Sequence, residues 1–373
     1  MTQVADRGGE WLRSRARPWE VVCFAWLPVC VVGFAFWYLL RARGADGDFP
    51  IFRTASKAVL RGRSPYVALD ANVLAHFDKF VYPPPAAFLV SPLAVVPYDV
   101  AKALLFVLGV AATLAALRVL GVRDWRCYGL AAASAPVVDS VALGAFTSFL
   151  LLGTALTWCY RDRPALAGSA AALTSVLKLF LWPLGLWLLF TKRVRATAVF
   201  AVLAVVLVVA GWAAIGFAGF HSYPHLVRVL SRVEAGVSYS PIALLRLSGS
   251  AATALSVVLV AVVVLAVFYE ARGRDGDRRS FTIAVLGSLL ATPVLWLHYF
   301  ALLFVPIALY RPRLSGLWFV PVAFWATPAG HSGGSLWRIA LSLAVLAIVA
   351  VRTLGGSRVR LNGLEPVVAP SQR

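Results

Sequence analysis

Long apolar runs recur along the chain from residue 21 to residue 351, and shorter polar stretches separate them. A run of about 20 apolar residues is enough for a helix to span the hydrocarbon core of a bilayer. These runs are continuous and rich in Ala, Leu and Val, whereas a membrane β-barrel would show segments of about ten residues with alternating polarity. The pattern therefore predicts an all-α, polytopic membrane protein.

Several of the runs are shorter than about 17 residues or are interrupted by proline. Such segments are tolerated as half-helices or re-entrant loops where they line a cavity walled by protein. We therefore expect about 11 or 12 transmembrane helices. The candidate spans are residues 20–40, 83–98, 100–121, 126–143, 144–160, 164–178, 179–191, 194–216, 251–270, 280–296, 297–310, 314–328 and 334–353.

Two long polar segments, residues 41–82 and 217–250, interrupt the apolar pattern. Basic clusters mark other connections, among them TKRVR at 191–195 and RGRDGDRR at 272–279. Lys and Arg concentrate in the cytoplasmic loops of membrane proteins. The basic clusters are therefore expected inside the cell, and the two long polar segments are expected on the extracytoplasmic side.

The same rule gives the organisation of the whole chain. Residues 1–19 and 354–373 are predicted cytoplasmic tails, and residues 20–353 are predicted to form a single transmembrane domain. The first polar segment is near the lower size limit for independent folding, so no separate soluble domain is expected. Residues 98–160 do not follow a simple alternation, because Arg118 and its neighbours favour the cytoplasmic side unless one span is a half-helix.

Composition agrees with this class of protein. Of the 373 residues, 61% are hydrophobic and 14% are charged, and the net charge is +19. The basic loops account for that charge, and no basic patch is interleaved with aromatic residues, so nucleic acid is not an expected partner. The four cysteines are scattered and show no metal-ligand spacing, so neither a metal site nor a disulfide framework is predicted.

The first polar segment opens with two acids, Asp46 and Asp48, where the chain leaves an apolar run. The stretch DFPIFRTASKAVLRG follows, and its apolar spacing predicts an amphipathic helix on the membrane surface that Gly62 ends. Solvated acids that cap this helix are one interpretation. The other is catalytic, because ionisable groups near hydrocarbon tend to be functional and a carboxylate there can act as a general base.

Two further candidates interrupt apolar runs. Lys178 lies in AALTSVLKLFLWPLGLWLL, where it either extends its ammonium to the membrane surface or contacts an anionic lipid phosphate. His298 lies in ATPVLWLHYF, where it either belongs to the interfacial aromatic belt or donates a hydrogen bond in an active site. The sequence alone leaves both pairs of interpretations open.

The remaining polar residues give weaker signals. Asp139 lies in an apolar run and is a candidate polar contact, and His221, His225, Glu234 and Arg246 lie in the second polar segment. The stretch FVYPPPAAFLVSPLAVVPYDVAKAL contains no reactive group, and its prolines predict turns and helix breaks at the membrane edge. We therefore interpret that stretch as structural.

In this order and spacing, four segments resemble glycosyltransferase family 87, which comprises GT-C-type integral membrane enzymes of actinobacteria. The family includes polyprenyl-phosphate-mannose-dependent α-mannosyltransferases. The resemblance covers about residues 20–350. The segments that carry it are DFPIFRTASKAVLRGRSPY, FVYPPPAAFLVSPLAVVPYDVAKAL, VLKLFLWPLGLWLLFTKRVRA and ATPVLWLHYFALLFVPI.

The resemblance implies a GT-C fold with an essential aspartate in its first outer loop. Asp48, with Phe52, Gly62 and Tyr66 behind it, fits the family frame better than Asp46 does. The family's Lys-x-x-Pro-like segment is similar to the chain at Lys178, although the proline comes later here. The family's Ser-Pro-x-Ser-Trp-x-His-Tyr segment is similar at His298, with both serines replaced.

One departure from the family pattern affects the expected specificity. Many members carry Gly-Gln-x-Asn before the middle helices, whereas this chain has Ala145 and Thr147 at those places. The missing amides remove contacts that could recognise a sugar. Besides sugar identity, the departure leaves a structural partner in a cell-envelope complex as an alternative to an active enzyme.

From the resemblance we expect transfer of a hexose, in the first place mannose, from a polyprenyl-phosphate sugar to a lipid or glycan acceptor. The protein is expected in a bacterial plasma membrane, with its active site on the extracytoplasmic side. Asp48 would be the general base in an inverting reaction. Lys178, Arg53 and Arg246 would offset the phosphate charge, and His298 would hydrogen-bond a sugar or the phosphate. Tyr66 and Asp46 are further candidates for contact with the donor phosphate or sugar. No cofactor or metal is expected. The alternatives are an arabinosyl- or glucosyltransferase of the same fold, and a lipid or solute transporter.

Overall fold

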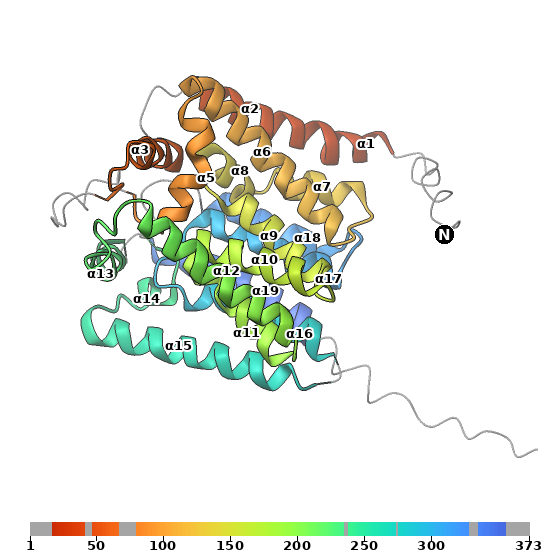
Figure 1. The fold of residues 1–373 in the computed structure, drawn as a ribbon. Coiled ribbons are helices and arrows are strands. Elements are labelled where there is room, and N and C mark those ends of the chain that lie inside the picture. Colours follow the sequence, from red (N-terminus) through yellow and green to blue (C-terminus); the bar gives the residue numbers. More distant parts are fainter. Residues whose placement is uncertain are drawn as a thin grey trace, which may run out of the picture.

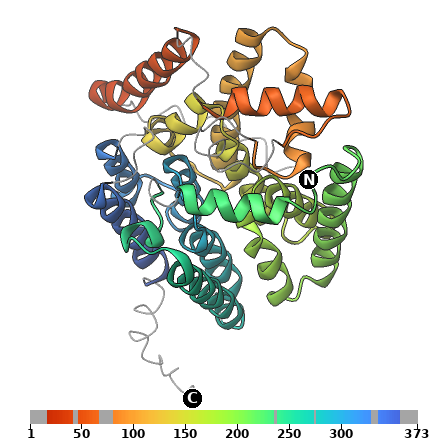
Figure 2. The same cartoon turned by 90° about the vertical axis from the view of Figure 1, so that its left-hand side faces the viewer.

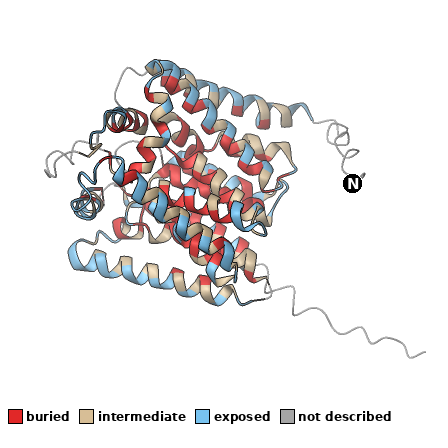
Figure 3. Ribbon diagram, in the orientation of Figure 1, coloured by how far each residue is buried: buried red, intermediate tan, exposed pale blue. Residues whose placement is uncertain are grey.

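The computed structural model describes residues 17–41, 47–66, 80–234, 238–273, 275–327 and 335–355. Every regular element in these ranges is a helix, which confirms the predicted all-α polytopic class. The helices surround a buried centre, while long helices such as α2 and α15 lie on the outside and expose one face (Figure 1, Figure 3).

The first half of the described chain begins with a continuous helix and continues through shorter ones. Its elements are α1 (Pro18–Val21), η2 (Val22–Trp26), α2 (Leu27–Arg41), α3 (Asp48–Leu60), α5 (Pro84–Ala94), α6 (Tyr98–Val119), α7 (Trp125–Ala132), α8 (Ala135–Leu143), α9 (Thr147–Cys159) and α10 (Pro164–Leu177).

The second half alternates short 3₁₀ segments with α-helices. Its elements are η3 (Leu179–Leu181), α11 (Pro183–Phe190), α12 (Val194–Ala213), α13 (Tyr223–Val233), α14 (Pro241–Leu244), α15 (Gly249–Glu270), α16 (Gly276–Ala291), η5 (Leu297–Leu303), α17 (Phe304–Tyr310), α18 (Gly316–Phe319), η6 (Val320–Ala326) and α19 (Leu336–Leu354).

Five helices in the described ranges are long and apolar enough to cross a bilayer, namely Pro18–Arg41, α6, α12, α15 and α19. The pair α8 and α9 also passes this test but is bent by 117°. Five further apolar helices are shorter. The expected 11 or 12 crossings are therefore reached only if the bent pair and shorter helices also cross, because proline and glycine break many of the apolar runs.

Polar contacts define two ends of the bundle. At the first, which we call the Asp277 end, the Asp277 carboxylate lies 3.2 Å from Arg161 and 2.6 Å from Arg193. At the second, which we call the Asp48 end, the Tyr82 hydroxyl donates a 2.8 Å hydrogen bond to Asp48. Figure 2 looks onto the second end, where α3 and α13 lie across the ends of other helices.

The position of α5 explains why residues 98–160 do not alternate simply in the sequence. Residues 83–98 were expected to span the membrane, but α5 instead packs along α3 at the Asp48 end. Arg53 of α3 donates a 2.6 Å hydrogen bond to the carbonyl oxygen of Val96, just after α5 ends. Because α5 does not lead away from this end, α6 carries Arg118 to the opposite end, where the other arginine-rich turns lie.

The predicted amphipathic helix is present as α3, and it ends before Gly62 as expected. Its apolar face is turned toward the protein, where Phe52 is fully buried and the Ser56 hydroxyl donates a 2.7 Å hydrogen bond to Ala87 of α5. Gly62 has a φ of 65°, the left-handed conformation in which glycine commonly ends a helix. This packing holds the first turn of α3 in place.

Candidate active site around Asp48

Two glycines determine where α3 begins and therefore where Asp48 lies. Gly47 has a φ of 109°, and a Cβ there would lie 2.8 Å from the carbonyl oxygen of Leu143. Gly144 has a φ of 69°, and a Cβ there would lie 2.7 Å from the Cβ of Phe49. Neither site accommodates a side chain. The start of α3 thus packs directly on the turn between α8 and α9.

Asp48 is half-buried and is held by Tyr82, which lies just before α5. The Tyr82 hydroxyl donates a 2.8 Å hydrogen bond to Asp48 Oδ2. Burial, and then the neighbouring Asp48 carboxylate, hold the pKa of the Tyr82 phenol well above its ordinary value. Tyr82 therefore remains protonated, and it acts as a hydrogen-bond donor that orients Asp48.

Lys178 lies over the ring of Tyr82. Its ammonium is 3.9 Å from the centroid of that ring and 4.8 Å from the centroid of Tyr299, and it donates a hydrogen bond to the Tyr299 hydroxyl. Helix α10 ends at Leu177, and Lys178 has an extended backbone with a φ of −142°. The ammonium is thus held by aromatic faces, which attract cations.

His298 lies beside this group on the 3₁₀ helix η5. Its ring is 4.6 Å from the Tyr299 ring, and its Nδ1 is 3.4 Å from Asp139 Oδ2 on α8. The side chain is buried, and its Nε2 atom has no hydrogen-bond partner among the described residues. A carboxylate on Nδ1 leaves Nε2 as the nitrogen that can contact a ligand.

The structure therefore brings together three residues that are each separated by more than 100 positions. Asp48 and His298 are linked through Tyr82, Lys178 and Tyr299, and we call these five residues the Asp48 cluster. Sequence analysis singled out Asp48, Lys178 and His298. It interpreted the stretch with Tyr82 as structural and Tyr299 only as a neighbour of the histidine, because a tyrosine at a membrane edge is usual.

Tyr66 supports the Asp48 cluster from behind. Its hydroxyl donates a 2.8 Å hydrogen bond to the backbone carbonyl of Tyr82, and its ring stacks on Trp212 with centroids 5.2 Å apart. Burial raises the pKa of the Tyr66 phenol far above its ordinary value, so the hydroxyl stays a donor. Among the described contacts, Tyr66 thus positions Tyr82, and its contact with the donor stays a prediction.

The other predicted site residues lie apart from the cluster contacts. Arg53 donates to Val96 and lies over the Tyr98 ring at 5.4 Å. Arg246 is exposed, with a φ of 52°, and its guanidinium makes no hydrogen bond or ion pair with the described residues. Asp46 lies outside the described residues. In this structure, neither arginine contacts the Asp48 cluster.

The Asp48 cluster combines complementary chemical groups. It provides a carboxylate that can accept a proton, an ammonium that can contact an anion, and an imidazole nitrogen with an open hydrogen-bonding position. No group of three or more His, Cys, Asp or Glu side chains within the described ranges could hold a metal ion. This combination is suited to the transfer of a group that departs as an anion.

Comparison with known proteins identifies the class to which this helical body and its polar end belong. Residues 80–297 match the family model of glycosyltransferase family 87, which covers more than half of the 373 residues. The chain belongs to glycosyltransferase family 87 and is thus a membrane glycosyltransferase. No match was found among curated proteins or among solved structures.

The matched range covers only part of the Asp48 cluster. It includes Tyr82 and Lys178, starts after Asp48 and ends one residue before His298. It also includes the turn at Ala145 and Thr147, where the chain departs from the family pattern. This turn touches α3, since the Phe146 ring is 4.2 Å from Phe52.

Proposed function

We propose that the protein transfers a hexose, most specifically mannose, from a polyprenyl monophosphate carrier to a hydroxyl of a lipid or glycan acceptor. The observation that supports this function is that Asp48 and Lys178 both contact Tyr82, Asp48 at the hydroxyl and Lys178 at the ring face. A base and an anion-binding group are then held next to each other, as transfer from a sugar phosphate requires.

In the proposed reaction, Asp48 removes the proton from the acceptor hydroxyl. The oxygen attacks C1 of the sugar, the bond from C1 to the phosphate oxygen breaks, and the carrier leaves as polyprenyl phosphate with inversion at C1. Lys178 offsets the charge of the departing phosphate, and His298 contacts the sugar or the phosphate group through Nε2. This chemistry requires no metal or other cofactor.

The orientation of the molecule supports an extracytoplasmic site. Arginine-rich turns gather at the Asp277 end, where Arg161 and Arg193 contact Asp277. By the positive-inside rule this end faces the cytoplasm, together with the two tails, and the Asp48 end faces outward. We accordingly place the protein in a bacterial plasma membrane, with its lipid-linked donor and its acceptor meeting on the outer side.

The rival functions differ in how well the findings support them. Family membership does not favour a lipid or solute transporter. An arabinosyl- or glucosyltransferase would use the same base and phosphate contacts, so only the sugar pocket would distinguish it. Thr147, which replaces a family amide, is buried and its hydroxyl has no partner among the described residues. That replacement is consistent with a sugar other than mannose.

The decisive experiment is transfer by purified protein supplied in turn with polyprenyl-phosphate mannose, glucose and arabinose, and with lipid extracts as acceptors. We expect a mass increment of one hexose on an acceptor lipid with the mannose donor. Asp48→Asn should reduce transfer by about 10²–10⁴-fold, because it keeps the side-chain size and removes the base. The protein should still fold and insert.

Asp99→Asn is the matched control. Asp99 lies in the first turn of α6, as Asp48 does in α3, but it is exposed and outside the cluster. The control should keep full activity. Full activity of Asp48→Asn would refute the assignment of the base, and loss confined to an Asp46→Asn variant would move the base to Asp46.

A further inference from the structure

A cavity of about 760 Å³ lies at the Asp277 end, away from the Asp48 cluster. It is formed between the turn from α11 to α12 and the end of α15, and α16 contributes one carboxylate. Its lining residues are Leu189, Phe190, Thr191, Lys192, Arg193, Phe268, Ala271, Arg272 and Asp277. The transfer reaction proposed above uses none of them.

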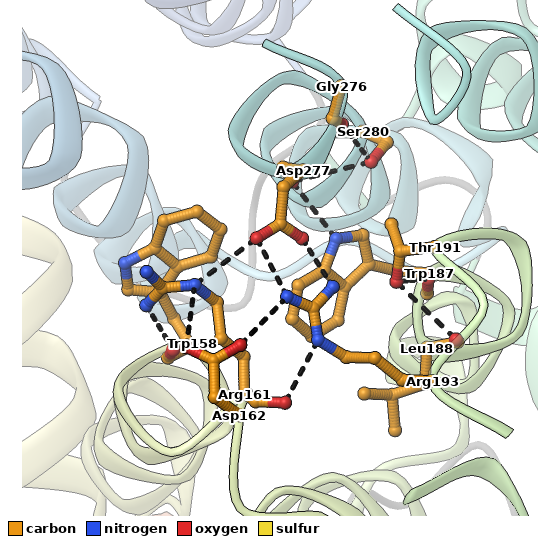
Figure 4. Close-up of polar contacts among 10 residues, drawn as sticks. All are labelled: Trp158, Arg161, Asp162, Trp187, Leu188, Thr191, Arg193, Gly276, Asp277 and Ser280. Atoms are coloured by element: carbon orange, nitrogen blue, oxygen red, sulfur yellow. Dashed lines mark hydrogen bonds and ion pairs between the residues drawn. The ribbon is translucent and has the colours of Figure 1, made fainter. Parts of the chain in front are cut away.

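The single carboxylate that lines this cavity is already neutralised. Arg193 contacts both oxygens of Asp277, at 2.6 and 2.9 Å, and Arg161 approaches at 3.2 Å (Figure 4). Lys192 and Arg272 also line the cavity, are exposed, and have no carboxylate partner among the described residues. Arg272 instead lies over the Phe268 ring at 3.6 Å. The cavity therefore carries two cations that are available to an anion.

The backbone of Lys192 is unusual for a lysine. The Lys192 amide donates to Leu189 and the Arg193 amide donates to Leu188, which is the hydrogen-bond pattern that closes a helix around a left-handed residue. Lys192 has a φ of 62° at this place, where glycine is strongly favoured. At this turn, Lys192 lies in the lining of the cavity.

Helices α3 and α6 close on a glycine at this position. Gly62 follows α3 and Gly121 follows α6, each with a positive φ and with open space around the position of a Cβ. Helix α14 instead closes on Arg246, with a φ of 52° and the same pair of backbone hydrogen bonds as at Lys192. The left-handed backbone alone therefore does not mark a binding residue, and what distinguishes Lys192 is its place in the lining of the cavity.

The apolar side chains that line the cavity adjoin the apolar outer surface of the helices. Phe190 and Phe268 are in edge contact with centroids 5.2 Å apart, and Leu189 is 46% exposed. In the most apolar 18-residue stretch of α15, only 11% of the residues are buried, and Leu265 is among the exposed ones. A ligand with an anionic head group and apolar chains would match both the two cations and the apolar side chains of the cavity.

We propose that this cavity binds the phosphate headgroup of an anionic phospholipid in the leaflet at the Asp277 end. Lys192 and Arg272 contact the phosphate, and the acyl chains lie along α15 and the apolar side chains that line the cavity. Basic pockets between membrane helices on the cytoplasmic side bind anionic headgroups in this way. The site is separate from the proposed transfer chemistry.

The test uses full-length protein in nanodiscs of phosphatidylcholine, to which phosphatidylglycerol is added in increasing proportion. Thermal unfolding and bound lipid measured by native mass spectrometry are the two readouts. Wild type should gain Tm and retain phosphatidylglycerol. The variant Lys192→Gly with Arg272→Gln should need ~30-fold more phosphatidylglycerol for half of the effect, since each cation near the surface contributes about 1 kcal/mol.

The choice of glycine protects this test from a folding artefact. The backbone of Lys192 is in the left-handed conformation, which glycine adopts without steric cost. The single variant Lys192→Gly should therefore have a Tm in pure phosphatidylcholine at least as high as that of wild type. The matched control is Arg118→Gln with Arg313→Gln, which removes the same charge from exposed positions outside the cavity. It should respond to phosphatidylglycerol as wild type does.

Three outcomes would overturn the proposal. An unchanged lipid response in the Lys192 and Arg272 variant would show that the cavity does not bind the headgroup. An equal rise in Tm from inorganic phosphate in pure phosphatidylcholine would show a simple anion site without any use for lipid chains. A response lost equally in the control would assign the effect to net charge, which also contradicts the proposal.

Discussion

Tyr82 connects two charged groups of the proposed reaction, since its hydroxyl binds Asp48 and its ring face contacts Lys178. Tyr82→Phe removes the hydroxyl and keeps the ring. Asp48 should lose its orientation while the Lys178 contact persists. We expect kcat to fall by about tenfold to a hundredfold with little change in KM, because a hydrogen bond to a charged group contributes about 1.5–3 kcal/mol. Steady-state kinetics with the polyprenyl-phosphate donor measures both constants.

Tyr223→Phe is the control for this substitution. The Tyr223 hydroxyl donates a 3.1 Å hydrogen bond to the backbone carbonyl of Val81, next to Tyr82, but it does not contact Asp48. The control should keep kcat within a few-fold of wild type. An equal loss in both variants would mean that the loop, rather than the contact to Asp48, is what the reaction requires.

Glu234 gives a prediction about pH at the end of α13. It is 4% exposed, its Oε2 has no partner among the described residues, and burial raises its pKa to about 7. The folded state therefore binds this proton more tightly than the unfolded state, where the pKa is about 4.3. Stability should fall as pH rises through about 4.3 to 7 and then level off.

Glu234→Gln should remove this part of the pH dependence. The neutral amide mimics the protonated acid, so Tm in detergent should match wild type near pH 5 and exceed it near pH 8. The measurement is a series of thermal unfolding curves across this range. A variant with the same slope as wild type would mean that Glu234 is not the titrating group.

For single residues, the sequence was informative where a charged or polar side chain interrupts or directly follows an apolar run. Lys178 and His298 stand in apolar runs, and Asp48 follows one, so each could be singled out. Tyr82 could not, because tyrosine beside prolines at a membrane edge has an ordinary structural explanation. Its role depends on two partners, and both are distant in sequence.

The elements around Asp48 are held by glycines, and this can be tested with two matched variants. Gly144 and Gly121 both have left-handed backbones, with φ of 69° and 79°. A Cβ at Gly144 would press on Phe49 of α3, whereas a Cβ at Gly121 would meet open space. Alanine at either site should lower Tm, since the left-handed conformation costs about 1–2 kcal/mol.

Only Gly144→Ala should also reduce transfer. The added methyl group must displace the first turn of α3, and with it Asp48, so we expect an activity loss of tenfold or more at a temperature where the variant is folded, since displacements of about 1 Å cost about 10²-fold. Gly121→Ala should retain activity per folded molecule. Equal activity in the two variants would contradict a positioning role for the contact between α3 and the α8–α9 turn.

Elements were predicted well where apolar runs were uninterrupted. Residues 194–216 and 251–270 correspond closely to α12 (Val194–Ala213) and α15 (Gly249–Glu270). The run at 126–143 is instead divided into α7 and α8, with Pro136 in the first turn of the second helix. Hydropathy could not distinguish these cases, because it measures transfer from water and not whether the backbone stays helical at a proline.

For the whole molecule, the class was readable from composition and apolar patterning, but the site was not. The order of motifs suggested the family, and the resemblance favoured Asp48 over Asp46 and matched Lys178 and His298, which were already candidates. Their contact through Tyr82 and Tyr299 depends on α5 staying beside α3 and on α10 ending at the same level. Such long-range packing is not encoded in any one segment.

Helix length has a consequence for the surrounding bilayer. Helix α10 has 14 residues and rises about 21 Å, whereas the 22 residues of α15 rise about 33 Å. Exposed leucines at 166, 173 and 179 mean that lipid meets this short edge. A hydrocarbon layer of about 30 Å is expected to thin beside so short a helix. In the proposed reaction, thinning on that flank would bring the donor phosphate closer to the depth of Lys178.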